Sequence, residues 1–538
     1  MRRLLVTAVL AAALAGCATA PADQAARLDP AERWWSHVAE LASDRYEGRF
    51  TGSPGYARAA DYVAARFKAE GLQPAGTDGY LQPVPLVEQA VLSDRSSLTL
   101  ATEGAGARPL SFQTEVILGN RTLQPKTVDA PLVFIGYGLH LPEAGYDDVA
   151  AAGDLKGKIV VYLNGGPSTL SAALKSHSRA ADFERVLERA GAAGAISLAN
   201  PKSMDIPWER SVLLAGKPGM WIDDPALTRT EGEFFSASFN PAQAEALFAG
   251  SGHSFVEMLA LADAQKPMPR LALKTRVSGS VAASTRKLSA PNVAALLPGS
   301  DPALKDEYVV LTAHLDGLGI GEPIGGDRVY NGAMDNAAGI ASMLETARAL
   351  KASPERPKRS ILFVAVTAEE RGLLGSRWFA ERPTVARSKL AANINMDMYL
   401  PLFPLKALTI LGIEESSLGA QARAAAEARG LMLEPDPQPD RNSFIRSDQY
   451  SFIRTGVPAL ALKFATPTGS PEAAAQKAWL TQRYHAPSDD LGQPVDRAAA
   501  ARFNLYLGDL IRRVADAPAR PRWQDDSFFK RFAAREAP

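Results

Sequence analysis

The sequence predicts an α/β fold, a three-layer sandwich built around a mostly parallel central sheet. Short apolar stretches, such as residues 308–313 and 361–366, are rich in β-branched side chains. Stretches of this kind are typical of strands that are buried on both faces. They alternate with segments of helical character, such as residues 340–351 and 498–515. Such alternation predicts strands joined by helices that cover both faces of one sheet.

The elements expected before this region are mainly helical. Residues 29–42 carry a helical apolar stripe, and Asp29 and Pro30 suit the start of a helix. A loop at 47–54, a helix at about 55–71 and strands and turns over 82–115 follow. After residue 300, strand-like and helix-like stretches alternate at 308–313, 340–351, 361–366, 393–396, 407–412, 418–429, 458–463 and about 498–515.

Length and charge limit the classes of function. The chain has 538 residues, of which 46% are hydrophobic and 22% charged, so more than one globular domain is expected. Lys and Arg together number 59, as do Asp and Glu, and the formal net charge is zero. A nucleic-acid-binding protein would need a basic bias. The composition therefore gives no sign of nucleic acid as a partner.

Metal-binding side chains follow several of the apolar stretches. Glu369 and Glu370 stand side by side after residues 361–366, where two carboxylates repel each other. A metal ion would offset that repulsion, although acids also suit the first turn of a helix. Histidine and carboxylate together suit zinc, and side chains at the carboxyl ends of parallel strands converge on one crevice. The others of this set are His314, Asp335, Asp397 and His485.

Five motifs in order carry a family resemblance: His314-x-Asp316, Asp335-Asn336, Glu369-Glu370, Asp397-Met398 and Tyr484-His485. Together they resemble the co-catalytic di-zinc exopeptidase family, which includes bacterial leucyl aminopeptidases and glutamate carboxypeptidase-like metallopeptidases. The resemblance implies two zinc ions per chain and a zinc exopeptidase fold. His314 and Asp397 would hold one ion, Glu370 and His485 the other, and Asp335 would bridge both.

The same resemblance implies catalytic roles for three further residues. Glu369 would be the general base, which takes a proton from a metal-bridging water and passes it to the leaving amine. Asp316 would orient His314 by accepting its second ring N–H. Tyr450 lies where relatives often carry a residue that contacts the substrate carbonyl, but a tyrosine packed against the adjoining helix is the alternative.

Substrate preference depends on a polar, proline-containing loop at 434–448. Arg441 and Arg446 in this loop would bind a substrate carboxylate, or would pair with Asp440 or Asp448. We expect an aminopeptidase that acts on peptides. The alternatives are a glutamate-carboxypeptidase-like dipeptidase, a glutaminyl-cyclase-like zinc acyltransferase with one zinc, and a non-catalytic binding relative.

A middle section resembles an inserted, β-rich protease-associated domain. Strand-like residues 131–138 and 154–163 precede a helical stretch at 179–190 and a further strand-like stretch at 191–198. The insert is placed at 129–265, between two parts of the catalytic domain at 29–128 and 266–538.

The N-terminus predicts export. Two arginines precede a short apolar segment that is too short for a permanent membrane span. It ends at Cys17, the only cysteine, in a sequence that resembles a bacterial lipobox. We therefore expect a signal peptide at 1–16, a lipidated Cys17 that attaches the protein to a membrane, and a tether at 17–28. Ala18 favours the outer membrane of a Gram-negative bacterium, by analogy with such lipoproteins.

Overall fold

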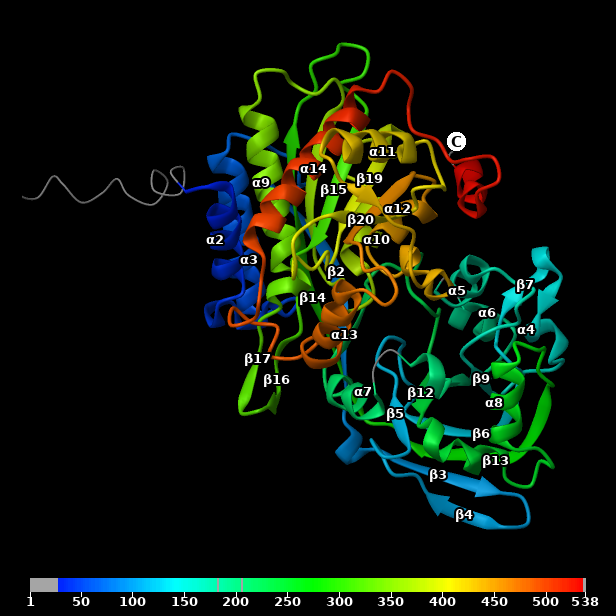
Figure 1. Ribbon diagram of the computed structural model, residues 1–538. Helices are drawn as coiled ribbons and strands as arrows, with labels where there is room; N and C mark the ends of the chain where they lie inside the picture. Colours follow the sequence, from blue (N-terminus) through cyan, green and yellow to red (C-terminus); the bar gives the residue numbers. More distant parts are fainter. Residues whose placement is uncertain (1–27, 181–182, 205–206, 536–538) are drawn as a thin grey trace, which may run out of the picture.

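The computed structural model describes residues 28–180, 183–204 and 207–535, which form two bodies, each around its own sheet (Figure 1). The predicted signal peptide and Cys17 lie outside the described residues. Within the described ranges, no helix combines the length and the apolar character that a membrane span requires.

The first body contains a ten-stranded mixed sheet in the order β11-β2-β14-β18-β15-β19-β22-β20-β21, with β1 paired to β14. Its four central strands run parallel, as the sequence predicts, whereas β14 and β20 run antiparallel to their central neighbours. The central strands are β15 (Tyr308–His314), β18 (Ser360–Val366), β19 (Leu390–Met396) and β22 (Ala459–Phe464). The outer strands are β1 (Gln73–Pro74), β2 (Leu81–Val91), β11 (Gly219–Ile222), β14 (Ala283–Leu297), β20 (Ala407–Leu411) and β21 (Met432–Leu433).

Helices cover both faces of this sheet and complete the three layers (Figure 1). The larger core lies under α2 (Pro30–Leu41), α3 (Pro54–Ala69), α9 (Ala338–Ala352), α11 (Leu418–Ala428) and α14 (Arg497–Asp516). The other face packs against α10 (Leu374–Glu381) and α12 (Gln449–Arg454). Asp29 caps α2 by accepting hydrogen bonds from the backbone N–H groups of Ala31 and Glu32. The helix α13 (Pro471–Gln482) leads into the loop that carries His485.

The second body contains an eight-stranded sheet in the order β4-β3-β13-β6-β9-β10-β12-β5. Its strands are β3 (Ser97–Thr102), β4 (Gly106–Pro109), β5 (Val116–Leu118), β6 (Thr127–Phe134), β9 (Ile159–Leu163), β10 (Gly194–Leu198), β12 (Phe235–Phe239) and β13 (Leu271–Ser280). The sheet therefore extends beyond the predicted insert at 129–265, because β3, β4 and β5 precede that range and β13 follows it. Helices α4 (Asp148–Ala151), α5 (Ala172–Ala180), α6 (Phe183–Arg189), α7 (Trp208–Ala215) and α8 (Phe255–Asp263) belong to this body.

The two bodies share backbone and side-chain contacts. Strand β11 comes from the middle of the second body's sequence, yet it pairs antiparallel with β2 of the first sheet. Lys217, just before β11, donates to the carbonyl oxygens of Leu318 and Ile320, 2.8 and 2.5 Å away. Leu318 directly precedes, and Ile320 belongs to, a small hairpin of β16 (Gly319–Ile324) and β17 (Asp327–Tyr330). The C-terminal segment η10 (Phe528–Arg535) packs with α12, and its Arg531 pairs with Glu143 of the second body.

Candidate metal centre

The predicted ligands converge at the carboxyl edge of the parallel strands. His314 is the last residue of β15, and Asp397 comes directly after β19. Glu370 lies in the turn after β18, and Asp335 lies in the segment that leads into α9. His485 reaches the same place from the loop after α13. Five segments that are distant in sequence thus bring their ligands to one crevice, as expected for this kind of sheet.

The five side chains form two clusters that share Asp335. His314 Nε2 lies 3.1 Å from Asp335 Oδ1 and 3.5 Å from Asp397 Oδ1. His485 Nε2 lies 3.4 Å from Asp335 Oδ2 and 3.3 Å from Glu370 Oε2. Each oxygen of Asp335 therefore faces a different histidine. The pairing matches the ligand sets that the family resemblance implies.

The donor atoms fit two zinc ions. Ligand atoms about 2.1 Å from one tetrahedral ion stand about 3.4 Å from each other, close to the separations of 3.1 to 3.5 Å found here. Nε2 of His314 and Oδ1 of Asp397 are buried and lack a hydrogen bond of acceptable geometry. Orphaned buried polar atoms are rare in folded proteins. Lone pairs placed in this way suit a metal cation.

The electrostatics of the metal-free centre fit the same conclusion. Burial by itself lowers the pKa of His485, but the nearby Glu370 and Asp335 outweigh burial and raise it to about 10. The pKa of His314 is likewise raised well above its ordinary value by Asp335 and Asp397, against the effect of burial. The carboxylates favour positive charge between them, and in the metal-free centre the protonated imidazoles supply it. Bound metal cations would supply that charge instead.

Residues 292–511 match the model of peptidase family M28. These residues, called the M28 region below, contain all five candidate metal ligands, as well as Asp316 and Glu369.

Curated relatives resemble shorter stretches. The chain is 39% identical over 106 residues to a probable zinc metalloprotease of Pyrenophora tritici-repentis, covering 20% of this chain and 23% of that protein. It is 29% identical over 193 residues to aminopeptidase YwaD of Bacillus subtilis, covering 34% of this chain and 36% of that protein. The matched parts therefore span only about a quarter to a third of these relatives' lengths.

A solved structure resembles most of the chain. The aminopeptidase from Aneurinibacillus sp. strain AM-1 aligns with a TM-score of 0.54 and 19% identity, covering 93% of this chain and 96% of that chain. At this identity the likeness concerns the fold, and it extends over both bodies.

Three of the turns that carry site residues in the M28 region have left-handed backbone conformations. Ala368, Met398 and His485 have φ angles of 52°, 50° and 55°. Side chains other than glycine avoid this region unless the surrounding structure holds them there, and such strain is concentrated at functional sites. Ala368 precedes the glutamate pair, and Met398 follows Asp397, so each strained turn places a ligand or its neighbour.

The Asp316 carboxylate does not accept the second ring N–H of His314, contrary to the sequence-based expectation. Nδ1 of His314 lies 3.1 Å from the backbone carbonyl oxygen of Asp316 and 4.0 Å from its carboxylate. The carbonyl, rather than the carboxylate, therefore holds the ring. The Asp316 side chain instead accepts the backbone N–H groups of Glu369 and Glu370 over 2.9 and 3.3 Å. Its carboxylate is already used by the turn that carries the glutamate pair.

Asp489 is a buried site residue to which the sequence reasoning assigned no role. Its carboxylate accepts the backbone N–H groups of Met334 and Asp335 over 2.9 and 3.0 Å, and an N–H of Gln493 over 2.6 Å. It therefore fixes the backbone of the shared ligand, Asp335. The signal in the sequence was a second acidic pair, Asp489-Asp490, four residues after His485.

Glu369 lies beside the candidate ligands in the M28 region, and its surroundings raise its pKa. Burial raises the pKa of Glu369 well above its ordinary value. The charges of Asp397, Asp448 and Glu370 raise the pKa further, against the opposite influence of His314. A carboxylate in this environment accepts a proton readily, as a general base must.

Asp397 lines a cavity whose wall also includes residues of the predicted polar loop at 434–448. It has a volume of about 260 Å³, and Met398, Arg441, Arg446 and Tyr484 are among the residues that line it. Nη1 of Arg441 donates to Gln438 over 2.9 Å. The loop thus lines a cavity beside a metal ligand, as expected, while a substrate-binding role for either arginine stays a prediction.

Tyr450 occupies the packed position that was the alternative interpretation of this residue. Its hydroxyl lies 2.6 Å from Nδ1 of His177, on α5 of the second body. Tyr450 is only 3% exposed, and it lies in an apolar cluster with Phe444 and Phe532. It lines neither of the cavities that reach the metal ligands. The expected contact with a substrate carbonyl therefore has no support in this arrangement, because the hydroxyl is engaged between the bodies.

Proposed function

We propose that this protein is a zinc-dependent exopeptidase, and specifically an aminopeptidase that hydrolyses N-terminal residues from peptides. The observation that carries the proposal is the pair of clusters that share Asp335, one at His314 and Asp397 and the other at Glu370 and His485. The match of residues 292–511 to the model of peptidase family M28 supports the same activity.

The zinc ions would be held by these five residues, with Asp335 common to both. When bound, they would supply Lewis acidity for the scissile carbonyl and lower the pKa of water in the site. Glu369 takes a proton from the attacking water and delivers it to the leaving amine. Asp316 keeps Glu369 in place through its backbone N–H. Asp489 does the same for Asp335.

Metal content and the glutamate base test this proposal together. Purified protein should contain about two zinc ions per chain, and chelation should abolish hydrolysis of aminoacyl-anilides. Glu369→Gln should retain the zinc and lose roughly 100- to 10,000-fold in kcat, since general-base catalysis contributes on this scale. Glu355→Gln, at an exposed position, is the control and should keep full activity. A single bound zinc with cyclisation of N-terminal glutamine would instead support an acyltransferase.

We also propose export of the protein as a lipoprotein, on the basis of the N-terminal apolar segment and Cys17. Membrane fractionation of cells that express the wild-type chain and Cys17→Ser tests this. The wild-type protein should sediment with the outer membrane, and the variant should be released. Equal fractionation of both chains would contradict lipidation at Cys17.

A further inference from the structure

The two pairs of candidate metal ligands differ in how the surrounding structure supports them. His314 ends β15 and Asp397 follows β19, so strands of the first sheet place this pair. Nδ1 of His314 lies 3.1 Å from the backbone oxygen of Asp316, which holds the ring. Lys463, on the neighbouring strand β22, donates to the backbone oxygen of Asp397. These contacts all lie within the first body.

Glu370 and His485 lie on connecting segments instead of at the ends of strands. Nδ1 of His485 is buried and has no hydrogen-bond partner among the described residues. Metal-binding histidines almost always donate this second ring N–H to a carbonyl or a carboxylate, which fixes the ring. The His485 ring is therefore positioned by its backbone, whose φ angle is 55°, and by the ring of Tyr484, which stacks on it with centroids 3.8 Å apart.

A side chain of the second body holds the backbone of the His485 loop. Arg210 lies on α7, which is placed directly below α13 in Figure 1. Nη1 of Arg210 donates to the backbone oxygen of Tyr484 over 3.0 Å, and Nη2 donates to that of Thr481 over 3.2 Å. The planar fork of one guanidinium suits two such acceptors. Arg210 thus joins the last turn of α13 to the residue directly before His485.

Arg210 also supplies a cation that the last turn of α13 lacks. The last four carbonyl groups of a helix have no partner within the helix, and a nearby cation stabilises them. The last turn of α13, which the structure describes in full, has no basic residue. Arg483, which follows the helix, donates to the backbone oxygen of Ser488. The contact therefore stabilises the end of α13 and the loop that begins there.

The turn that carries Glu370 also contacts the second body. Arg121, from the segment between β5 and β6, donates to the backbone oxygen of Glu370 over 3.4 Å, a longer and weaker bond. Asp335, which both ligand pairs share, is held separately by the carboxylate of Asp489. The contacts between the bodies thus concern the two ligands that belong to one of the two metal positions.

We propose that Arg210 is a positioning residue for the metal ion at Glu370 and His485, so that this ion, unlike its neighbour, depends on the contact between the two bodies. The inference rests on the proposed zinc-dependent function and adds that the two metal positions differ in their support. Without the two bonds of Arg210 the loop is freer to move, and the His485 ring moves with its backbone. Groups that support metal ligands typically change metal affinity by roughly 10- to 100-fold.

Titration of Arg210→Gln with zinc tests the inference. The metal-free wild-type protein, in competition with a fluorescent zinc chelator, should bind two zinc ions. Arg210→Gln should bind one ion as tightly as the wild type and the other roughly 10- to 100-fold more weakly. A general loss of stability would affect both positions. Equal weakening of both ions, or of neither, would therefore overturn the proposal.

A double-mutant cycle identifies which ion is weakened. His485→Gln removes a ligand of one position and leaves the ion at His314 and Asp397, so adding Arg210→Gln should not change the remaining affinity. Asp397→Asn removes a ligand of the other position. Adding Arg210→Gln to this variant should weaken the remaining ion by roughly 10- to 100-fold. The opposite pattern would assign Arg210 to the wrong ion and overturn the proposal.

Two controls separate Arg210 from other changes in the second body. Glu209→Gln alters the exposed neighbour of Arg210 on the same helix. Arg531→Gln removes a bond to Glu143 that also joins the bodies, over 2.9 Å, but involves no residue next to a metal ligand. Both variants should bind two zinc ions with wild-type affinity. An Arg531→Gln protein that loses the same ion as readily would overturn the specific role of Arg210.

Zinc binding is measured without substrate, which separates this inference from the proposed function. A protein that binds two zinc ions but hydrolyses no aminoacyl-anilide would contradict the peptidase proposal, and the titration of Arg210→Gln would still decide the inference. Two ions of unchanged affinity in Arg210→Gln would overturn the inference and leave the peptidase proposal intact. A wild-type protein that binds no zinc would overturn both.

Discussion

The backbone N–H of Glu369 donates a hydrogen bond to Oδ1 of Asp316 over 2.9 Å. With the neighbouring bond from Glu370 to Oδ2, over 3.3 Å, one buried carboxylate holds the backbone of both glutamates. The turn that carries them follows β18, whereas Asp316 follows β15, the adjacent parallel strand. The proposed general base and a candidate metal ligand are therefore positioned by a residue that follows the strand next to their own.

Asp316→Asn should weaken zinc binding and catalysis together. The substituted amide keeps one acceptor oxygen and turns an NH₂ group toward a backbone N–H, so one of the two bonds is lost. We expect roughly 10- to 100-fold weaker zinc affinity, as for other groups that support metal ligands, and a lower kcat. Titration with a fluorescent zinc chelator measures the affinity. Asp301→Asn is the control, since Asp301 also accepts two backbone N–H groups, in a turn outside the site. Wild-type affinity in Asp316→Asn would contradict this role.

Tyr450→Phe should affect stability more than catalysis. The substitution removes the hydroxyl that lies 2.6 Å from His177 and keeps the ring in its apolar cluster. Loss of one such hydrogen bond should cost about 1 kcal/mol of stability, seen as a lower thermal midpoint, with kcat within about threefold of wild type. If Tyr450 contacted a reacting carbonyl, kcat would fall roughly 100-fold or more at unchanged stability. The two measurements together therefore decide between a packed tyrosine and a catalytic one.

Strand-end ligands could be predicted because their pattern is local. An apolar, β-branched run that ends in His314 or Asp397 specifies both the buried strand and the side chain at its tip. Strands were expected over 82–115, but the antiparallel pairing of β2 with β14 was not predicted, because it joins segments about 200 residues apart. The extent of the second sheet was missed for the same reason, since β3 and β13 meet only in the folded chain.

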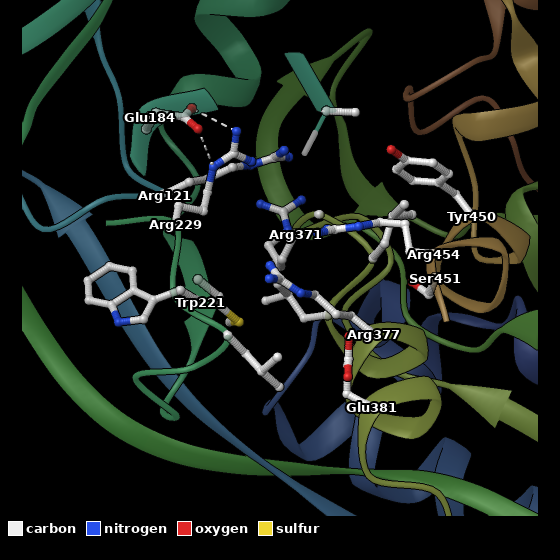
Figure 2. A pocket seen from close by; sticks show the side chains of 16 residues that line it. Arg121, Glu184, Trp221, Arg229, Arg371, Arg377, Glu381, Tyr450, Ser451 and Arg454 are labelled. Atoms are coloured by element: carbon white, nitrogen blue, oxygen red, sulfur yellow. Dashed lines mark hydrogen bonds and ion pairs between the residues drawn. The ribbon is translucent and has the colours of Figure 1, made fainter. Parts of the chain in front are cut away.

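The roles of supporting residues were harder to predict than the ligands. Asp316 was expected beside His314 on sequence proximity, yet its carboxylate faces the turn of a neighbouring strand. His177 lies 273 residues from Tyr450, so no local pattern reports their contact. A cavity lined by Arg121, Arg229 and Arg371 likewise combines residues from both bodies (Figure 2). Tertiary packing decides what such polar side chains contact, and single-sequence patterns do not contain that information.

Lys217 should make the stability of the protein depend on alkaline pH. Burial lowers the pKa of Lys217 from 10.5 to about 8. Between these values the unfolded chain binds the proton and the folded chain does not, so the contribution of Lys217 to stability rises with pH. Relative to Lys217→Met, the wild-type free energy of unfolding should increase from pH 8 to pH 10, by at most about 3 kcal/mol. Denaturation with urea at several pH values measures it.

The control for Lys217 is Lys477→Met, at an exposed position of α13. The stability difference between this variant and the wild type should stay constant over the same pH range. A constant difference for Lys217→Met as well would show that Lys217 keeps an ordinary pKa in the folded protein. A difference that shrinks with rising pH would contradict the direction of the shift.

Arg49→Lys should destabilise the loops beneath the metal centre. The buried Arg49 guanidinium donates to the backbone oxygens of Leu41, Leu315, Asn331 and Gly332, over 2.6 to 2.9 Å.

Two of those segments lead directly into Asp316 and Asp335, so Arg49 ties site loops to the end of α2. A lysine has one nitrogen in place of the planar fork and leaves several buried carbonyls unpaired. Each unsatisfied group costs about 1 to 3 kcal/mol, so the thermal midpoint should fall by several degrees and zinc affinity should drop with it. Arg58→Lys, at a partly exposed arginine that donates to the carbonyl of Arg45 and pairs with Glu47, should change neither quantity. An Arg49→Lys protein as stable as Arg58→Lys would mean that these four bonds do not hold the loops.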